Sequence, residues 1–482
     1  MLKKKSFFLF SLLLILAFSC RKDIITQDAG AKLEFSEDTI IFDTVFTTIG
    51  SVTKYLKVYN PNKRPVKISS IRIASGNNSN FRMNVDGVPA IQAKDIILRP
   101  DDSIFVFVEV TVNPNNVNNP MVISDSIIFE TNGNLQDIDL VAWGQDANFY
   151  YYPVFGNYSL NSIKPHVIYG YGFVDSASTL TVDAGAKIYF HKSSGLIVLS
   201  EGTLKITGTL EKPVVIQGDR LEWDYHDVPG QWDMIWFSNL NKGGTSNAPG
   251  SKNNEINYAI IKNGNIGLRV DTNGSGWNVP TLKINNSIVE NMSGVALLGE
   301  GSFIEATNCV FANTGQYTVA LAYGGNYRFL NCTMANYWKY GKRDTPLLLI
   351  NNYYETSTGI ISRPLEKAEF INCIIYGANE NEIKLDQNSG SLFEHKFSYC
   401  LLKTDISISD ANHFTGIVLN PSSVTVDNQL HDPVFNNAGE LDFHLFGLSA
   451  AINKGISDSI PLDLDGKTRD SQPDIGAFEY VP

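Results

Sequence analysis

The sequence has little positive charge, few ionisable residues and only five cysteines. It contains 38 Lys and Arg against 50 Asp and Glu, a formal charge of -12, so it lacks the basic surface that nucleic-acid phosphates require. Charged residues make up only 18% of the chain, whereas Asn, Ser, Thr and Gly are abundant. This balance argues against nucleic acid as a partner and suits an exported protein in a saccharide-rich environment.

The apolar run at the N-terminus, Phe7–Phe18, is too short for a membrane-spanning helix. Lysines precede it and a cysteine follows it, which is the layout of a secretory signal. The segment Ala17-Phe18-Ser19-Cys20 resembles the lipobox of bacterial lipoproteins. The resemblance implies that residues 1–19 are a signal peptide, that Cys20 is lipidated, and that residues 20–31 form a tether to the cell outer membrane. The alternative is an ordinary secretory peptide.

Residues 32–146 contain no cysteine, so this unit must hold its core without a disulfide. Short alternating strands between Pro, Asn and Gly turns predict an all-β sandwich. The unit resembles the immunoglobulin-like domains that precede many bacterial surface modules, which implies a role in spacing or docking. The expected strands are Leu33–Phe35, Thr39–Phe42, Tyr55–Tyr59, Val66–Ile73, Ile104–Val112, Asp125–Phe129 and Ile138–Ala142.

One short phrase recurs through the second half of the chain. It joins Asn or Tyr to a small residue and an apolar run, and it begins at residues 258, 286, 308, 331, 372 and 399. Successive copies are therefore 28, 22, 23, 41 and 27 residues apart, a period typical of stacked supersecondary units. The copies are too short for two helices and too rich in β-branched residues and Gly. They predict a parallel β-helix, whose equivalent strands pair about 4.8 Å apart.

Segments at both ends of these repeats resemble right-handed parallel β-helix proteins of the pectate-lyase-like superfamily in Bacteroidota. Leu180–Phe190 is similar to their opening coils, and Pro473–Tyr480 to their closing segment. The resemblance is specific for fold rather than for activity. It implies an all-β chain, an immunoglobulin-like β-sandwich followed by a right-handed parallel β-helix. The expected boundaries are a linker and β-helix cap at 147–179, the β-helix at 180–425 and a C-terminal closing segment at 426–482.

Four cysteines fall at one position of the repeat, directly after the Asn or Tyr that begins it. The other copies have a small residue at this position, Ala259 or Ser287. A row with one residue per coil is spaced too widely for disulfides and cannot surround one ion as a tetrahedron. We therefore expect free, buried thiols at Cys309, Cys332, Cys373 and Cys400. Two rows of Asn, one including Asn286 and the other Asn263, are expected to bond within the bends.

Two insertions enlarge the 41-residue coil and are candidates for ligand binding. Both place aromatic rings beside Lys or Arg, which suits stacking on sugar rings and pairing with uronate carboxylates. A protein interface would use the same residues, and packing of the rings onto the helix wall is the third alternative. The candidate ligand-binding residues are Tyr337, Trp338, Tyr340, Lys342, Arg343, Tyr353, Tyr354 and Arg363.

An earlier insertion, residues 219–227, concentrates carboxylates beside a His, an Arg and two aromatic residues. Such a set could bind Ca²⁺ or supply acid–base groups, although a solvated loop is the favoured interpretation. The candidate metal ligands are Asp219, Glu222, Asp224 and Asp227. No other cofactor is expected.

The sequence contains few features that indicate catalysis. The Gly-His-Gly and Arg-Ile-Lys segments of related glycoside hydrolases are missing, and Arg269 with Asp271 on one coil is a weak candidate for a lyase site. We therefore expect an outer-membrane-anchored lipoprotein that acts as a non-catalytic binding or scaffold protein. Its partner would be a polysaccharide or an outer-membrane protein complex. The alternative is a polysaccharide lyase or glycoside hydrolase acting on an acidic glycan.

Overall fold

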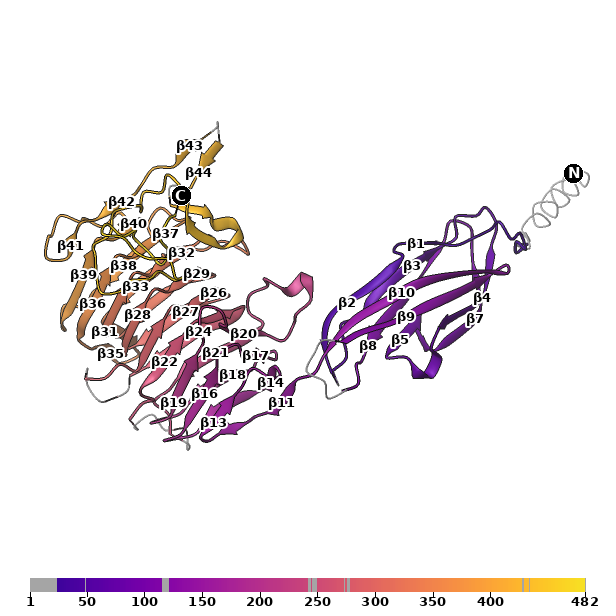
Figure 1. The fold of residues 1–482 in the computed structure, drawn as a ribbon, viewed down its shortest axis with the longest axis horizontal. Coiled ribbons are helices and arrows are strands. Elements are labelled where there is room, and N and C mark those ends of the chain that lie inside the picture. The colour runs from indigo at the N-terminus through magenta and orange to yellow at the C-terminus, as the bar shows by residue number, and fades with distance from the viewer. Residues whose placement is uncertain are drawn as a thin grey trace, which may run out of the picture. The chain divides into compact units, whose positions relative to one another are not determined.

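The computed structural model describes residues 24–481, except 48, 115–120, 242–243, 245–248, 273, 275–277, 427–428 and 433. The predicted signal peptide and Cys20 lie outside the described residues. The chain divides into two compact units, residues 1–146 and 147–482, and each is described here by itself (Figure 1).

The first unit is a sandwich of two five-stranded sheets, as its alternating strands predict. Inward-facing positions such as Leu56, Val106 and Phe129 are fully buried and form one apolar core. Strands β5 to β7 were not among the expected ones. One sheet has the order β1 (Glu34–Phe35), β3 (Lys54–Tyr59), β8 (Ser103–Val110), β5 (Phe81–Val85), β6 (Val88–Ala90). The other has the order β2 (Thr39–Phe46), β10 (Asn134–Gln145), β9 (Met121–Thr131), β4 (Val66–Ile73), β7 (Gln92–Leu98), and a short 3-10 turn, η1 (Gly76–Asn78), precedes β5.

The second unit is a parallel β-helix built from three long sheets, which confirms the predicted fold class (Figure 1). Sheet 1 contains β11 (Asn148–Tyr151), β14 (His166–Tyr169), β17 (Lys187–Phe190), β20 (Val214–Gly218), β23 (Ala259–Lys262), β26 (Ile288–Met292), β29 (Val310–Thr314), β32 (Thr333–Asn336), β37 (Ile374–Gly377), β40 (Leu401–Leu402) and β42 (Val418–Leu419). Sheet 2 contains β12 (Val154–Phe155), β15 (Tyr171–Val174), β18 (Gly195–Val198), β21 (Trp232–Phe237), β24 (Gly264–Asp271), β27 (Val295–Glu300), β30 (Val319–Ala322), β33 (Leu348–Asn351) and β38 (Ile383–Asp386). Sheet 3 contains β13 (Tyr158–Leu160), β16 (Thr179–Asp183), β19 (Thr203–Thr207), β22 (Asn254–Asn257), β25 (Leu282–Asn285), β28 (Phe303–Thr307), β31 (Gly325–Leu330), β36 (Leu365–Ile371), β39 (Phe393–Ser398) and β41 (Phe414–Thr415).

The β-helix begins earlier than expected. Residues 147–179 are not a linker and cap, because β11, β12 and β13 already pair in parallel with β14, β15 and β16. Tyr150 and Phe155 pack against the same apolar core as the later coils. The clustered tyrosines of this segment therefore belong to the first coil.

Left-handed backbone bends explain the repeated Asn. Asn286, Asn308, Asn331 and Asn372 have φ between 49° and 52°, a conformation that Asn adopts more readily than other residues with a Cβ. Their amides also bond from coil to coil, as in Asn308 Nδ2 to Asn286 Oδ1 at 3.2 Å and Asn372 Nδ2 to Asn331 Oδ1 at 3.0 Å. The second row behaves in the same way, with Asn291 Nδ2 2.7 Å from Asn263 Oδ1. Both rows are structural, as predicted.

The four repeat cysteines are free and fully buried, which confirms the prediction. Each thiol donates to the carbonyl oxygen two residues before it, at 3.2 to 3.4 Å. Burial raises the pKa of the Cys309 and Cys373 thiols. A neighbouring interior row stacks Phe329, Phe370, Phe397 and Phe414 nearly parallel, with ring centroids 4.8 to 5.4 Å apart.

The closing segment, residues 426–482, covers the outer side of sheet 1. Apolar residues from the two, including Val310 and Ile374 of sheet 1 and Phe435 and Phe478 of the segment, form a second core. The Asn row that includes Asn286 helps to hold the closing segment, because Asn372 exchanges two 2.8 Å hydrogen bonds with the backbone of Ile456. β43 (Val424–Val426) leads into the segment and pairs with β44 (Gln429–His431). The segment also contains η3 (Ala438–Glu440) and β45 (Phe435–Asn437), which pairs with β46 (Asp442–Leu445).

Candidate functional site on sheet 2

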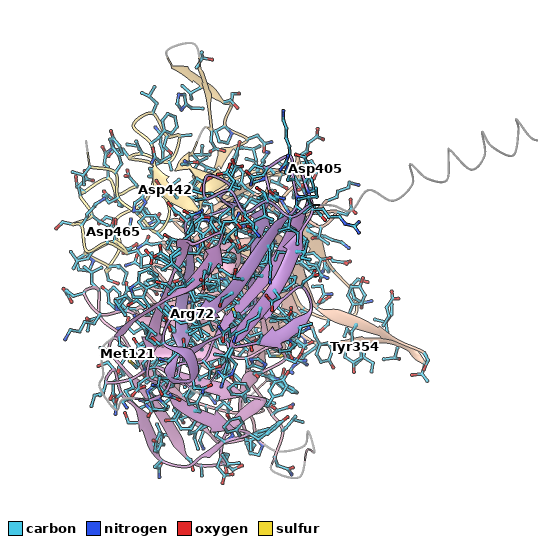
Figure 2. All side chains as sticks on the ribbon, turned by 90° about the vertical axis from the view of Figure 1, so that its right-hand side faces the viewer. Arg72, Met121, Tyr354, Asp405, Asp442 and Asp465 are labelled. Atoms are coloured by element: carbon cyan, nitrogen blue, oxygen red, sulfur yellow. The ribbon has the colours of Figure 1, made fainter. Side chains whose placement is uncertain are left out.

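A cleft of about 610 Å³ lies against the outer side of sheet 2. The ends of β21, β24, β27 and β30 supply its floor, and the insertion after β33 supplies one wall. This insertion is a separate two-stranded hairpin, β34 (Tyr353–Thr356) and β35 (Gly359–Ser362). Figure 2 shows the hairpin, with Tyr354 labelled, standing away from the sheets. The cleft is lined by Trp236, Asn239, Leu240, Arg269, Asp271, Thr272, Glu300, Ala322, Tyr323, Asn351, Tyr353, Tyr354, Glu355 and Arg363.

Strand register places Arg269 at the centre of the floor. Trp236 of β21 pairs with Arg269 of β24, and Asp271 pairs with Glu300 of β27. The guanidinium lies over the Trp236 ring, 4.5 Å from its centroid. It also contacts both carboxylates, at 3.3 Å to Asp271 and 2.7 Å to Glu300. One cation therefore bridges two carboxylates that would otherwise repel each other across adjacent strands.

Asp271 is held on both of its carboxylate oxygens. The Trp236 indole N–H donates to Oδ2 at 2.9 Å, and Arg269 Nε donates to Oδ1 at 3.3 Å. Burial raises the pKa of Asp271 above its ordinary value, while Arg269 and Trp236 act in the opposite direction. The carboxylate therefore positions its neighbours, and neither oxygen is left without a donor.

The wall of the cleft is anchored by aromatic and guanidinium contacts. Tyr354 packs edge-on against Tyr323, with ring centroids 4.6 Å apart. Arg363, at the foot of the hairpin, lies 5.9 Å from the Tyr323 ring centroid and donates to Thr272 Oγ1 at 3.1 Å. The Tyr353 hydroxyl donates to Asp386 at 3.0 Å. These contacts fix the hairpin beside the floor residues.

Two glycines allow the hairpin to approach the floor closely. A Cβ on Gly301 would lie 2.6 Å from Arg363 Nη1, and one on Gly324 would lie 2.3 Å from the Pro364 carbonyl oxygen. Both have φ values, 55° and 69°, in the left-handed region that favours glycine. The sequence is therefore adapted locally to seat the foot of the hairpin.

The structure brings together two groups of residues that the sequence proposed separately. Tyr353, Tyr354 and Arg363 belong to the later of the two insertions in the 41-residue coil, residues 351–364, called here the third insertion. They line the same cleft as Arg269 and Asp271. Trp236, Glu300 and Tyr323 also line it, and sequence reasoning missed all three. The signal that could have found them is the strand register, because Trp236 precedes Arg269 by one coil and Glu300 follows Asp271 by one coil.

The second insertion, residues 337–344, does not join this cleft. Arg343 is not available to a ligand, because it forms a two-pronged ion pair with the buried Glu382, at 2.8 and 2.6 Å. Tyr337 donates to Asp432 and packs on Phe435 of the closing segment. These two predicted ligand-binding residues are structural.

The other members of the second insertion lie at or near the surface, away from the cleft. The Trp338 and Tyr340 rings pack together, with centroids 5.1 Å apart, and the Tyr340 hydroxyl donates to the Asp227 carbonyl. Lys342 is 85% exposed in its side chain and pairs with Asp344. The second insertion therefore contacts the earlier insertion, residues 219–227, rather than the third insertion.

Three of the four candidate metal ligands have separate partners. Asp219 contacts His191 at 2.7 Å, Glu222 contacts Arg220 at 3.0 Å, and Asp227 contacts His226 at 2.9 Å. Asp224 lies in the exposed turn η2 (Trp223–Tyr225). Among the residues that the structure describes, no three His, Cys, Asp or Glu side chains gather in an arrangement that could hold a metal.

Comparisons with known proteins do not assign a family. No family model and no curated protein matches the chain. A family 123 glycoside hydrolase from Clostridium perfringens matches at 10% identity and a TM-score of 0.17, over 25% of this chain and 26% of its own. The PapD-like domain of human CEP192 matches at 9% identity and a TM-score of 0.19, over 27% of this chain and 94% of its own. The VesB protease of Vibrio cholerae matches at 11% identity and a TM-score of 0.17, over 23% of this chain and 31% of its own.

The chain thus spans about a quarter of the glycoside hydrolase, and these TM-scores carry no argument about activity. Over the described part of the chain, no helix has the length and apolar character needed to cross a membrane. Any functional assignment must come from the cleft itself.

Proposed function

We propose that this protein is a lipid-anchored outer-membrane lipoprotein of a Bacteroidota-type cell that binds a polysaccharide without cleaving it. Its binding site is the sheet 2 cleft, and the sandwich spaces the β-helix from the anchor. The observation that carries the proposal is the combination of aromatic rings and hydrogen-bonding charged groups on one open surface. Trp236, Tyr323 and Tyr354 offer ring faces or edges, and Arg269, Glu300 and Arg363 offer donors and acceptors. Sugar rings are recognised by this kind of surface.

The geometry favours binding over catalysis. A lyase base must face the proton that it removes, but the guanidinium of Arg269 is already engaged by two carboxylates and lies over the Trp236 ring. A hydrolase acid must present its proton to a leaving oxygen, but both oxygens of Asp271 already accept hydrogen bonds from neighbours. These two residues, the weak catalytic candidates, are better suited to holding the site in shape.

A glycoside hydrolase is the second candidate, on one observation. Asp271 and Glu300 are carboxylates at paired positions of adjacent strands, and the two hydrolytic mechanisms use two carboxyl groups at defined separations. Burial raises the pKa of Asp271, as an acid would require. Release of reducing ends without unsaturated uronides from a polysaccharide panel would select this candidate over binding alone, whereas unsaturated uronides would indicate a lyase.

The binding proposal is tested by titration of the purified chain from Arg21 onward with a polysaccharide panel. Trp236→Ala is expected to weaken binding at least about tenfold, because the ring is part of the aromatic surface of the cleft and holds Arg269 and Asp271 in position. The matched control is Trp223→Ala, which removes a Trp that is 84% exposed outside the cleft and is expected to leave binding unchanged. Equal effects of the two substitutions would contradict the proposal.

Anchoring is tested separately with the full chain in its native cell. Metabolic labelling with a fatty acid should mark the wild type and not Cys20→Ala. An unlabelled wild type would remove the lipoprotein part of the proposal and leave glycan binding standing. A stoichiometric membrane-protein partner in a pull-down, without glycan binding, would instead favour a subunit of an outer-membrane complex.

A further inference from the structure

The charges around the cleft indicate which class of polysaccharide it takes. The lining contains two guanidinium groups, Arg269 and Arg363, and three carboxylates, Asp271, Glu300 and Glu355. The formal charge of the lining is therefore 2 - 3 = -1. A site for uronate or sulfated polymers would need an excess of cations to offset the negative charge of each residue of the ligand.

The more central of the two cations is already paired with two carboxylates, so a ligand carboxylate would compete with them. Arg269 contacts Glu300 at 2.7 Å and Asp271 at 3.3 Å, and its planar face is covered by Trp236. A uronate that displaced either carboxylate would leave that group unpaired beside the ligand, which is unfavourable in a partly buried site. The floor therefore resists an anionic ligand.

The same groups suit hydroxyls. Glu300 and Glu355 are acceptors at the open side of the cleft, where 39% of the Glu300 side chain is exposed. Ionised carboxylates form strong hydrogen bonds with hydroxyl donors, while the aromatic surface takes the apolar face of a ring. Acceptors and aromatic surface without net positive charge match a polyhydroxylated, uncharged ligand.

We infer that the sheet 2 cleft selects uncharged polysaccharides and discriminates against uronate and sulfated ones. This inference rests on the proposed glycan binding and adds the class of ligand. It departs from the acidic glycan that the enzyme alternative expects.

The experiment titrates the mature chain with uncharged polymers (glucan, mannan, galactan and highly methyl-esterified pectin) and with anionic ones (polygalacturonate, alginate and chondroitin sulfate). Esterified pectin and polygalacturonate share a backbone and differ in charge, so they form a matched pair. We expect saturable binding to at least one uncharged polymer, changing less than about twofold between 0.05 and 0.5 M NaCl, because no ion pair is formed. Anionic polymers should bind at least about tenfold more weakly.

Charge variants test whether the cleft, rather than the whole protein, makes the selection. Glu355→Lys changes the lining from -1 to +1 and is expected to improve polygalacturonate binding at least about fivefold. Glu394→Lys makes the same change at an exposed position of β39, outside the cleft, and should not. Equal gains from both variants would overturn the inference.

The outcomes separate the inference from the proposed function. Binding that is strongest for anionic polymers and weakens with salt would overturn the inference while the binding function stands. No binding to either class would overturn both. Selective binding to an uncharged polymer, lost in Trp236→Ala and retained in Trp223→Ala, would support both.

Discussion

Arg343 shows how one residue can look like a ligand contact and serve the core instead. Its side chain is 3% exposed and that of Glu382 is 0% exposed. The backbone N–H groups of Leu347 and Asn379 also donate to the Glu382 carboxylate, each at 2.9 Å. The pair therefore ties the second insertion to the loop before β38 inside a nearly dry region, where removing one partner leaves an uncompensated charge.

Arg343→Ala is expected to lower the free energy of unfolding of the β-helix by about 3–5 kcal/mol, because Glu382 would remain buried without its cation. Urea denaturation of the wild type and of Arg343→Ala measures the change in the free energy of unfolding. Lys342→Ala is the neighbouring control, since its ion pair with Asp344 is highly exposed, and it should cost less than about 1 kcal/mol. An Arg343→Ala protein as stable as the control would show that the pair does not support the fold.

At the scale of a single element, sheet 3 carries a row of alternating charge on its outer face. The row is defined by parallel register and contains Lys205, Glu255, Lys283, Glu305, Arg328, Glu369 and Lys396. Three adjacent pairs lie at 3.2 to 3.5 Å. A strand shifted by one residue would lose these contacts and turn its apolar side chains outward, so the row supports the register.

Glu305→Lys is expected to place three cations side by side, with Lys283 and Arg328 on either side, and to destabilise the β-helix by about 1 kcal/mol. The loss should shrink as NaCl is raised, because salt screens exposed charges. Thermal unfolding at low and high salt measures both effects, with Glu394→Lys as the control for an isolated charge change. A loss of stability that does not depend on salt would point to packing rather than charge.

The element scale also shows where sequence reasoning succeeded. The repeated phrase located the bends, and its small second position predicted the buried thiol row at Cys309 and Cys332, because each inference needed only one coil and its period. The first coil was missed because its strands, such as β12 at Val154–Phe155, are too short to show alternation.

The candidate site was only partly predictable, for a physical reason. Its floor joins residues that are 33 and 31 positions apart, Trp236 to Arg269 and Arg269 to Glu300, and loops of unequal length separate the coils. Without the register, these partners cannot be matched. In the same way, Arg343 meets Glu382 across 39 residues, so its burial was not visible in a local pattern of aromatic and basic residues.

Within the β-helix unit as a whole, charged contacts join separate parts of the closing segment to one another. His444 Nε2 lies 2.9 Å from Asp465, its other ring nitrogen contacts Asp442, and its ring packs against Phe478. Asp442 and Asp465 are labelled in Figure 2. Glu290 and Glu440 line the same 320 Å³ pocket, and Lys467 lies 3.5 Å from Asp465. The hydrogen bonds that His444 makes to the Asp465 and Asp442 carboxylates raise the pKa of His444. They also lower the pKa of Asp465 and, together with a hydrogen bond from Asn436, that of Asp442.

These shifts set the direction of the pH dependence. Because the folded-state pKa of His444 lies above its unfolded value, its contribution is complete below about pH 6.5 and is lost as the pH rises through the folded value. The contributions of Asp442 and Asp465 are lost at the acid end, as the pH falls through their depressed values. His444→Gln should therefore lower the thermal midpoint at pH 5.5 and have little effect at pH 9. A constant difference across this range would exclude the ion-paired histidine as its cause.

Glu290 acts in the opposite direction and gives the sharpest test of the segment's packing. Burial raises its pKa to about 7, although Lys262 partly offsets the effect. Such a carboxyl group destabilises the folded state as the pH rises from its unfolded value, about 4.3, through the folded one. Glu290→Gln is therefore expected to stabilise the protein at pH 8 by on the order of 1–3 kcal/mol and to leave it nearly unchanged at pH 4.5. Thermal unfolding at the two pH values measures this, and Glu394→Gln, at an exposed site, should change neither. A Glu290→Gln gain of equal size at both pH values would mean that amide packing, and not removal of a buried charge under the closing segment, explains the effect.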